Sequence, residues 1–191
     1  IFSKIYENNI WNKNSKNDFN SGPGSHDADI IKPYINEICS FLKINTNLTV
    51  LDIGCGDFNI GSHIFHNSKK YIAIDIVDKL IDRNKKKFNS NKLIFKKIDI
   101  VNEDIPKGDC LLIKEVLQHL PNNQIKIILS KLKNYNYIFL TESIPLFNFK
   151  PNMDKIKGPD CRIDINSAIV IDKPPFNFKY KSKKELLRIK K

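Results

Sequence analysis

The sequence predicts an α/β fold built on a mostly parallel sheet, and three observations lead to this prediction. Short, nearly continuous apolar segments alternate with helical segments along the middle of the chain. Such strands are typical of parallel sheets that helices cover on both faces. The 191 residues are enough for one domain with a full core, and 41% of them are hydrophobic, as in folded chains.

The first 26 residues are polar and rich in asparagine, with Trp11 and Phe19 as isolated anchors. They end in the sequence SGPGS, which predicts a hinge or a lid rather than core. We therefore divide the chain into an N-terminal arm, residues 1–26, and a domain, residues 27–191.

Helices and strands then follow one another in the order that the fold requires. Apolar spacing and capping residues predict four helices, at residues 27–43, 59–66, 78–88 and 122–133. Seven strands are expected, at residues 49–53, 71–76, 93–98, 110–113, 137–140, 162–165 and 168–171. The last two lie among prolines without a clear helix, which predicts an antiparallel addition at one edge of the sheet.

The formal net charge of +11 allows a nucleic-acid partner. However, only Arg83, Arg162 and Arg188 among the 32 basic residues are arginines, and phosphate and base recognition favours arginine. We interpret most lysines as solvated surface and keep nucleic acid as an alternative partner.

Four scattered cysteines form no C-x-x-C pair, which excludes a zinc site and a disulfide framework and indicates a reducing, cytoplasmic location. His63 and His66 lack a third ligand, so no metal site is assigned. No apolar run approaches the roughly 20 residues that span a membrane. The chain begins with Ile1 rather than methionine, so we expect a longer protein with another domain upstream.

A glycine turn follows the first strand in the stretch VLDIGCGDFNIG, residues 50–61. A dinucleotide-binding fingerprint needs a third glycine where Asn59 stands. The Gly-Lys-Ser/Thr ending of a phosphate-binding P-loop is also absent. The turn therefore predicts close approach of the backbone to a ligand, but not a site for a pyrophosphate.

This stretch resembles the first motif of class I S-adenosylmethionine (SAM) methyltransferases. Two further features of that family are present, because Asp75 in YIAIDIV and Asp99 in FKKIDIV end the next two strands. The resemblance covers about residues 27–143 and implies a Rossmann-like three-layer sandwich with SAM as cofactor and S-adenosylhomocysteine (SAH) as product. It implies that Asp75 accepts the ribose hydroxyls and Asp99 meets the adenine amine. The other residues expected to bind the cofactor are Asp52, Gly54, Cys55, Gly56, Ile76, Ile100 and Ser25.

Methyl transfer mainly requires alignment of the acceptor and exclusion of water, and a hydroxyl acceptor also benefits from a general base. The segment KEVLQHLP, residues 114–121, follows the fourth strand and offers His119 and Glu115 as catalytic bases. The alternatives are a structural hydrogen bond for His119 and a salt bridge to a lysine for Glu115. Candidate acceptor contacts are Lys114, Glu142, Arg162 and Trp11. For Arg162, an ordinary structural ion pair is the alternative to an acceptor carboxylate or phosphate.

The segments KEVLQHLP, SGPGS and PPFNF are together similar to a subset of small methyltransferases that modify small molecules or glycans. This resemblance implies O-methylation of a small acceptor, a sugar or nucleotide-sugar in glycan biosynthesis. The alternatives are an RNA methyltransferase that uses the basic surface, and a domain that binds SAM or SAH without turnover.

Overall fold

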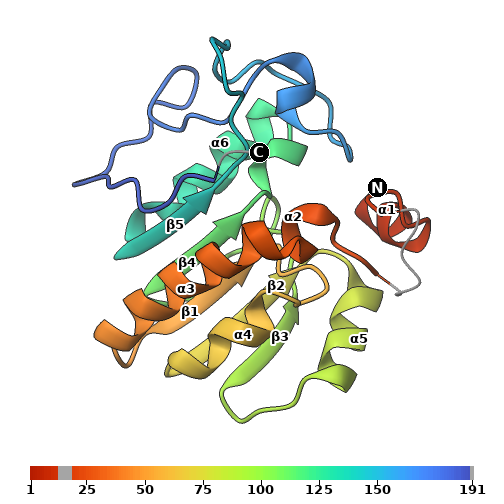
Figure 1. The fold of residues 1–191 in the computed structure, drawn as a ribbon, viewed down its shortest axis with the longest axis vertical. Helices are drawn as coiled ribbons and strands as arrows, with labels where there is room; N and C mark the ends of the chain where they lie inside the picture. The colour runs from red at the N-terminus through yellow and green to blue at the C-terminus, as the bar shows by residue number, and fades with distance from the viewer. Residues whose placement is uncertain (13–18, 190–191) are drawn as a thin grey trace.

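In a computed structural model, which describes residues 1–12 and 19–189, the chain forms a parallel sheet between helices (Figure 1). The strands are β1 (Thr49–Ile53), β2 (Lys70–Asp75), β3 (Leu93–Lys97), β4 (Cys110–Lys114) and β5 (Tyr137–Thr141). They lie in the order β3-β2-β1-β4-β5, and each neighbouring pair is parallel. The predicted α/β class and the parallel sheet are confirmed.

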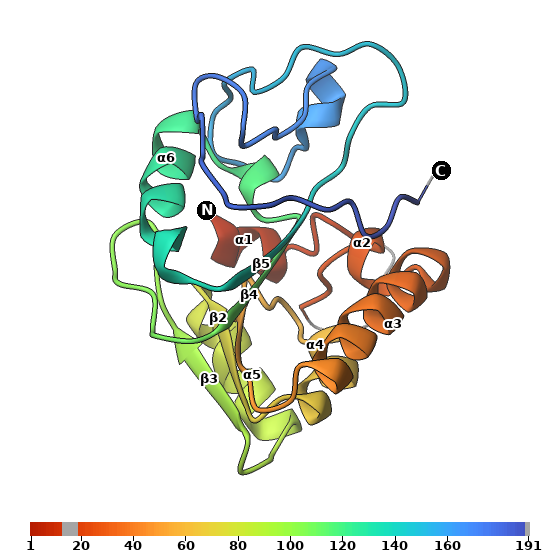
Figure 2. The same ribbon diagram turned by 90° about the vertical axis from the view of Figure 1, so that its left-hand side faces the viewer.

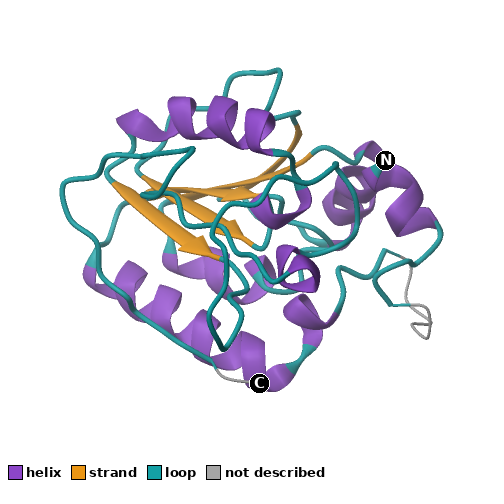
Figure 3. Cartoon of the chain, turned by 90° about the horizontal axis from the view of Figure 1, so that it is seen from above, coloured by secondary structure: helices purple, strands orange, loops and turns teal. Residues whose placement is uncertain are grey.

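The α-helices are α1 (Phe2–Glu7), α2 (Pro23–His26), α3 (Ala28–Ile44), α4 (Gly61–Ile64), α5 (Asp78–Lys87) and α6 (Asn122–Lys131). The described chain also contains the short 3₁₀ turns η1 (Phe65–Asn67), η2 (Leu117–His119), η3 (Leu132–Asn134) and η4 (Arg162–Ile165). Helices lie on both sides of the strands (Figure 3), so the sheet is the middle layer of three.

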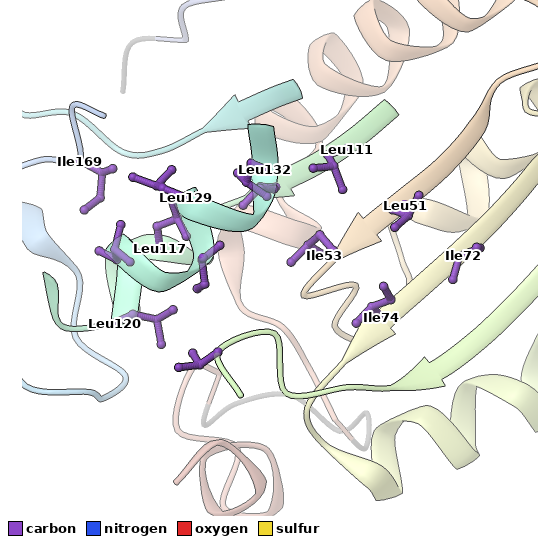
Figure 4. Packing of buried hydrophobic residues seen from close by; sticks show 14 residues of the cluster. Leu51, Ile53, Ile72, Ile74, Leu111, Leu117, Leu120, Leu129, Leu132 and Ile169 are labelled. Atoms are coloured by element: carbon purple, nitrogen blue, oxygen red, sulfur yellow. The ribbon is translucent and has the colours of Figure 1, made fainter. Parts of the chain in front are cut away.

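Alternate residues of the central strands enter two different cores. Leu51 and Ile53 of β1 pack with α6 residues such as Ile128 in one core (Figure 4). Val50 of β1 packs with Ile38 and other α3 residues in the second core. Strand side chains point alternately to opposite faces, and both faces of β1 are covered. This explains why the strands appear in the sequence as continuous apolar runs.

The N-terminal arm contributes to a third, smaller core, which differs from the expectation that it lies outside the core. Tyr6 of α1 is buried with Val77 and Leu80 at the start of α5. The ring of Trp11 lies 5.1 Å from that of Tyr6, edge to face. Residues 13–18 of the predicted arm lie outside the described part.

The prediction of two antiparallel strands near the C-terminus was wrong for the described residues. Residues 162–165 form the 3₁₀ turn η4, and residues 168–171 form no strand. The side chain of Asn152 takes the place of a strand partner: its Oδ1 accepts from Val170 N at 2.8 Å, and its Nδ2 donates to Val170 O at 2.9 Å. The described sheet therefore has five strands instead of seven.

Within the described ranges, none of the helices has both the length and the apolar composition needed to cross a membrane.

Candidate functional site

A cavity of about 230 Å³ lies where the carboxyl ends of the strands meet. Parallel strands present these ends at one edge of the sheet, where ligands bind in open α/β folds. Its wall contains the glycine turn after β1, the end of β2, the segment after β3 and the segment after β4. The predicted site residues that line it are Ser25, Gly54, Cys55, Gly56, Asp75, Ile76, Asp99, Ile100, Lys114, Glu115, His119 and Trp11.

The glycine turn requires glycine at two positions. Gly54 and Gly56 have φ of 71° and 56°, in the left-handed region that other residues rarely adopt. A Cβ on Gly54 would lie 2.5 Å from Val116 Cγ2, and one on Gly56 would lie 2.3 Å from Ser21 Oγ. The amides of Gly54 and Cys55 both donate to Ile74 O, at 2.8 and 2.9 Å. The turn is thereby fixed against the end of β2.

Asp75 connects the ends of β1 and β2. Its Oδ2 accepts from Gly56 N and its Oδ1 accepts from Val77 N, both at 3.0 Å. Burial raises the pKa of this carboxyl, while these backbone hydrogen bonds oppose the rise. Each oxygen retains a lone pair, so the carboxylate can accept further hydrogen bonds from a ligand.

Asp99 follows β3 and lines the same cavity as the glycine turn. Its Oδ1 accepts from Val101 N at 3.0 Å and its Oδ2 from Asn102 Nδ2 at 2.8 Å. Partial burial raises its pKa, but these hydrogen bonds and the charge of Lys157 outweigh it and lower the pKa. Asp99 is therefore a carboxylate at neutral pH.

Glu115 occupies a constrained position directly after β4. Its φ is 55°, and such a backbone conformation in a residue other than glycine is often found at functional sites. Its carboxylate accepts from Lys114 Nζ at 2.7 Å and from Ser143 Oγ at 3.1 Å. Burial raises the pKa of this carboxyl, but the charge of Lys114 and the hydrogen bonds from Lys114 and Ser143 lower it by more. The pKa therefore lies below its usual value. Glu115 thus stays charged at neutral pH.

His119 lies in the wall beneath the N-terminal arm. Its ring centroid is 5.2 Å from that of Trp11 and 6.4 Å from that of Phe2. Burial lowers its pKa and outweighs the backbone hydrogen bonds of Asp160 and Gly158, which raise it. The imidazole is therefore neutral at physiological pH, the form that can accept a proton.

The N-terminal arm covers the cavity through several hydrogen bonds. Trp11 Nε1 donates to Pro159 O at 3.2 Å, and Lys114 Nζ donates to Gly24 O at 2.8 Å. Ser21 N donates to Asp57 Oδ2 at 3.0 Å, which holds the arm on the loop after the glycine turn. Figure 2 shows α1 below the loops that follow β5. The arm and the loop of residues 157–161 thus both contribute to the cover.

Comparison with known proteins finds a match for the part of the chain that contains the strands and the glycine turn. Residues 51–135, from β1 to the region after α6, match the family model of a methyltransferase domain. Over these residues the chain is similar to methyltransferase domains. The predicted family resemblance is confirmed.

Relatives of the methyltransferase domain agree with this assignment. N-methyltransferase 4 of Papaver somniferum is 27% identical over 105 residues, which cover 51% of this chain and 29% of that protein. The chain thus spans less than a third of the length of this relative.

Two solved structures share its fold at low sequence identity. Magnesium protoporphyrin IX methyltransferase from Synechocystis PCC 6803, with bound SAH, gives a TM-score of 0.55 at 17% identity, covering 75% of this chain and 68% of that one. Phosphoethanolamine N-methyltransferase 1 of Haemonchus contortus, in complex with phosphoethanolamine and SAH, gives a TM-score of 0.50 at 17% identity. The match covers 61% of this chain and 26% of that one.

Three predicted site residues of the methyltransferase domain do not line the cavity. Asp52 accepts from Tyr71 OH at 2.9 Å within the second core, and burial raises its pKa to about 7. Glu142 is half-buried, and its Oε1 accepts from Leu117 N of η2 at 3.0 Å. Arg162 is 1% exposed, and its Nη2 donates to Leu120 O at 2.8 Å. The hydrogen bonds of these three side chains are made within the protein, outside the cavity wall.

Several lining residues were not predicted from the sequence. Phe2, Tyr6 and Ser21 belong to the arm, whose apolar side chains are too few to show a pattern. Gln118 and Cys161 also contribute to the wall. For Gln118, the spacing from Glu115 and its place beside His119 in one turn was a usable signal. In the part of the chain that the structure describes, no three His, Cys, Asp or Glu side chains form a metal-binding group.

Burial of Glu142 gives the methyltransferase domain a pH-dependent stability. Burial raises the pKa of Glu142 from 4.5 to about 8. The charge of Glu115 also raises this pKa, while the hydrogen bond from the amide of Leu117 lowers it. The folded state therefore binds one more proton than the unfolded chain between these two pH values. Stability is complete below the lower value and is lost as pH rises through the window.

We expect the free energy of unfolding to fall between about pH 5 and about pH 8. Glu142→Gln should make this decline shallower without abolishing it, since Asp52 titrates in the same direction. Urea unfolding at several pH values measures the effect, with Glu7→Gln, an exposed carboxylate, as the matched control. An unchanged slope in Glu142→Gln would contradict the assignment.

Proposed function

We propose that the chain transfers a methyl group from SAM to a small acceptor. The observation that carries the proposal is the meeting of the glycine turn, Asp75 and Asp99 in one cavity. The turn allows close approach of the backbone to the cofactor. Asp75 retains lone pairs for two ribose hydroxyls, and Asp99 suits an amine donor such as that of adenine. When bound, SAM would supply a methyl group attached to a positively charged sulfur. The sulfur is the leaving group when the methyl group is transferred.

The remaining lining residues have roles in this proposal that follow from their positions. Ile76 and Ile100 provide apolar contact next to the two carboxylates. Ser25 lies in α2, at the end of the arm, and is assigned to the methionine end of the cofactor. The arm, residues 1–26, acts as a lid that excludes water, since Trp11 and Phe2 form part of the wall. His119 and Glu115 are the candidates for accepting a proton.

A sugar hydroxyl as the acceptor gains no support from the relatives. Those named above are called N-methyltransferases and a porphyrin methyltransferase. We therefore propose a small-molecule acceptor without assigning it to glycan biosynthesis. Detectable methyl transfer to any acceptor would eliminate the alternative of a domain that binds SAM or SAH without turnover.

RNA remains a second candidate acceptor because the positive charge is unevenly distributed. Residues 78–97, which form α5 and β3, contain eight basic residues against two acidic ones. A surface depression on α5 is lined by Phe19, Lys79, Asp82, Arg83, Lys86 and Lys87. RNA bound by this surface would lose affinity steeply as salt rises, whereas a small neutral acceptor would be indifferent to salt.

We expect SAH to bind the protein and Asp75→Ala to weaken this binding at least about tenfold, as for loss of a hydrogen bond to a charged group. Trp11 lines the cavity and is the only tryptophan in the chain, so its fluorescence reports binding directly. Asp78→Ala is the matched control, because Asp78 is exposed at the start of α5. Circular dichroism checks that both variants are folded.

Failure of SAH to bind the wild-type protein would overturn the proposed function. Equal affinities of Asp75→Ala and Asp78→Ala would overturn the role assigned to Asp75. A labelled-methyl assay against a panel of small molecules and RNAs, with and without added salt, then separates the two acceptor classes.

A further inference from the structure

We propose that the methyl acceptor is an amine, bound by Glu115, Gln118 and His119 on one wall of the cavity. This inference rests on the proposed function, since it names the substrate class of the same site. It is carried by polar atoms in the wall that the protein itself leaves without partners.

Gln118 provides the first of these atoms. Its side chain lines the cavity and is only 4% exposed. Its Oε1 has no hydrogen-bond partner among the described residues, and its Nε2 lies 3.5 Å from Glu115 O. Buried side-chain oxygens are nearly always paired, so an unpaired one calls for an explanation. A ligand that donates a hydrogen bond explains it.

His119 provides the second atom, Nδ1, which is also buried and without a partner in the described ranges. The ring lines the cavity, and the backbone of Asp160 and Gly158 acts to raise its pKa against the effect of burial. Because burial keeps the imidazole neutral, only one ring nitrogen carries a proton. If that proton serves the backbone, Nδ1 presents a lone pair.

Glu115 provides the third acceptor. Its carboxylate receives hydrogen bonds from Lys114 and Ser143, but a carboxylate has about four acceptor sites, so it can receive more. It precedes Gln118 and His119 by three and four residues, and all three residues line the cavity. The wall is thus rich in hydrogen-bond acceptors.

Trp11 and Lys114, two donors of the surrounding wall, are already engaged within the protein. Trp11 Nε1 donates to Pro159 O, and Lys114 Nζ donates to Gly24 O and Glu115. Lys157 Nζ lies 5.3 Å from the centre of the Phe2 ring, and its charge acts on Asp99. An anionic acceptor beside Glu115 would therefore meet a negative charge whose lysine partner, Lys114, is already engaged.

An amine fits this arrangement better than a hydroxyl. A primary amine offers two N–H donors when neutral and three when protonated, whereas a hydroxyl offers only one. The rings of Phe2, Trp11 and His119 lie within 6.4 Å of one another, which suits an aromatic or apolar body and a cationic head group. The expected acceptor is a primary or secondary amine on such a body.

The reaction balances with the groups present. The lone pair of the neutral amine forms the new C–N bond as the bond between sulfur and the methyl carbon breaks, which leaves uncharged SAH. The nitrogen then carries one excess proton, which passes to His119 Nδ1 and on to water. Glu115 stabilises the positive charge that appears on the nitrogen.

The test compares ligands that differ only in the polar group. Benzylamine, benzyl alcohol and benzoate, and the matching phenethyl set, are titrated into the protein saturated with SAH while Trp11 fluorescence is recorded. We expect the amines to bind at least about tenfold more tightly than the alcohols and carboxylates, as for a site whose polar groups would otherwise stay unpaired. With SAM, the amines should yield methylated products by mass spectrometry.

Two variants separate the role of Gln118 from general effects on folding. Gln118→Leu should weaken amine binding at least about tenfold while leaving SAH affinity within about twofold. Gln124→Leu is the matched control, because Gln124 also has an unpaired side-chain oxygen but lies on α6 away from the cavity wall. Gln118→Glu adds a negative charge and should strengthen amine binding.

The outcomes are distinguishable. If SAH binds but alcohols or carboxylates bind as tightly as amines, or if Gln118→Leu leaves the amine preference unchanged, the amine proposal is overturned and the proposed function stands. If SAH does not bind the wild-type protein, both fall together.

Discussion

Replacing Arg162 with alanine should lower the free energy of unfolding by about 3–5 kcal/mol, as for loss of several hydrogen bonds from a buried charged group. Arg162 is among the largest fully buried side chains of the chain, at 1% exposure. Its Nη2 donates to Leu120 O at 2.8 Å and to Asn122 Oδ1 at 3.0 Å, and its Nη1 donates to Met153 O. Alanine would leave these oxygens unpaired in the interior.

The effect should reach the cavity through the segments that Arg162 holds together. The guanidinium joins the loop before α6, residue 153 and η4, and Cys161 next to it lines the cavity. Many domains have a total stability of only about 5–15 kcal/mol. An Arg162→Ala variant that fails to fold would therefore also agree with the prediction.

Urea unfolding followed by circular dichroism measures the change, with Arg188→Ala as the matched control. Arg188 is an exposed arginine paired with Glu185, and its removal should leave the stability unchanged. Arg162→Lys keeps the charge but cannot reach three oxygens, so it should fall between the wild type and Arg162→Ala. A fully stable Arg162→Ala that loses only turnover would instead favour the contact with the acceptor that the sequence suggested.

Replacing Gly54 with alanine should lower the free energy of unfolding by about 2–5 kcal/mol. The left-handed backbone conformation, with φ of 71°, accounts for about 1–2 kcal/mol of this in a residue with a Cβ. The rest comes from overpacking, since the new Cβ would lie 2.5 Å from Val116 Cγ2, and such contacts typically cost about 1–3 kcal/mol. SAH affinity should fall as well, because the turn lines the cavity.

The chain offers both a control and a partial rescue for this prediction. Gly158→Ala introduces the same methyl group at a position with nothing within 4 Å, so its stability should be close to that of the wild type. Val116→Ala combined with Gly54→Ala should remove the overpacking but retain the backbone strain. Equal stability of the Gly54→Ala and Gly158→Ala variants would show that the turn tolerates a side chain.

The convergence of Gly54, Asp75 and Asp99 in one cavity could be predicted from the sequence because it depends on strand order alone. Continuous apolar runs identify β1, β2 and β3, and a parallel sheet brings their carboxyl ends together. Gly54, Asp75 and Asp99 follow these strands, so their convergence in one cavity follows without knowledge of any side-chain contact.

The C-terminal region could not be predicted in this way, because side chains rather than strand pairing organise it. Asn152 bonds both the amide and the carbonyl of Val170, so an apolar stretch that resembles a strand never enters the sheet. The rarity of arginine correctly marked Arg162 as special, but composition alone does not distinguish a ligand contact from a buried anchor. Gln118 was missed because its significance lies in an absent partner, which only coordinates reveal.

The hydrogen bond between Trp11 and Pro159 has a consequence for the order in which the protein becomes functional during synthesis. Chains are made from the N-terminus, and domains fold as units while they emerge. A nascent chain that ends after β5 already has every strand of the described sheet, yet Trp11 of the arm still lacks its hydrogen-bond partner Pro159. The ribosome must add the residues up to Pro159 before this contact can form. Synthesis thus completes the sheet before it completes the wall of the cavity.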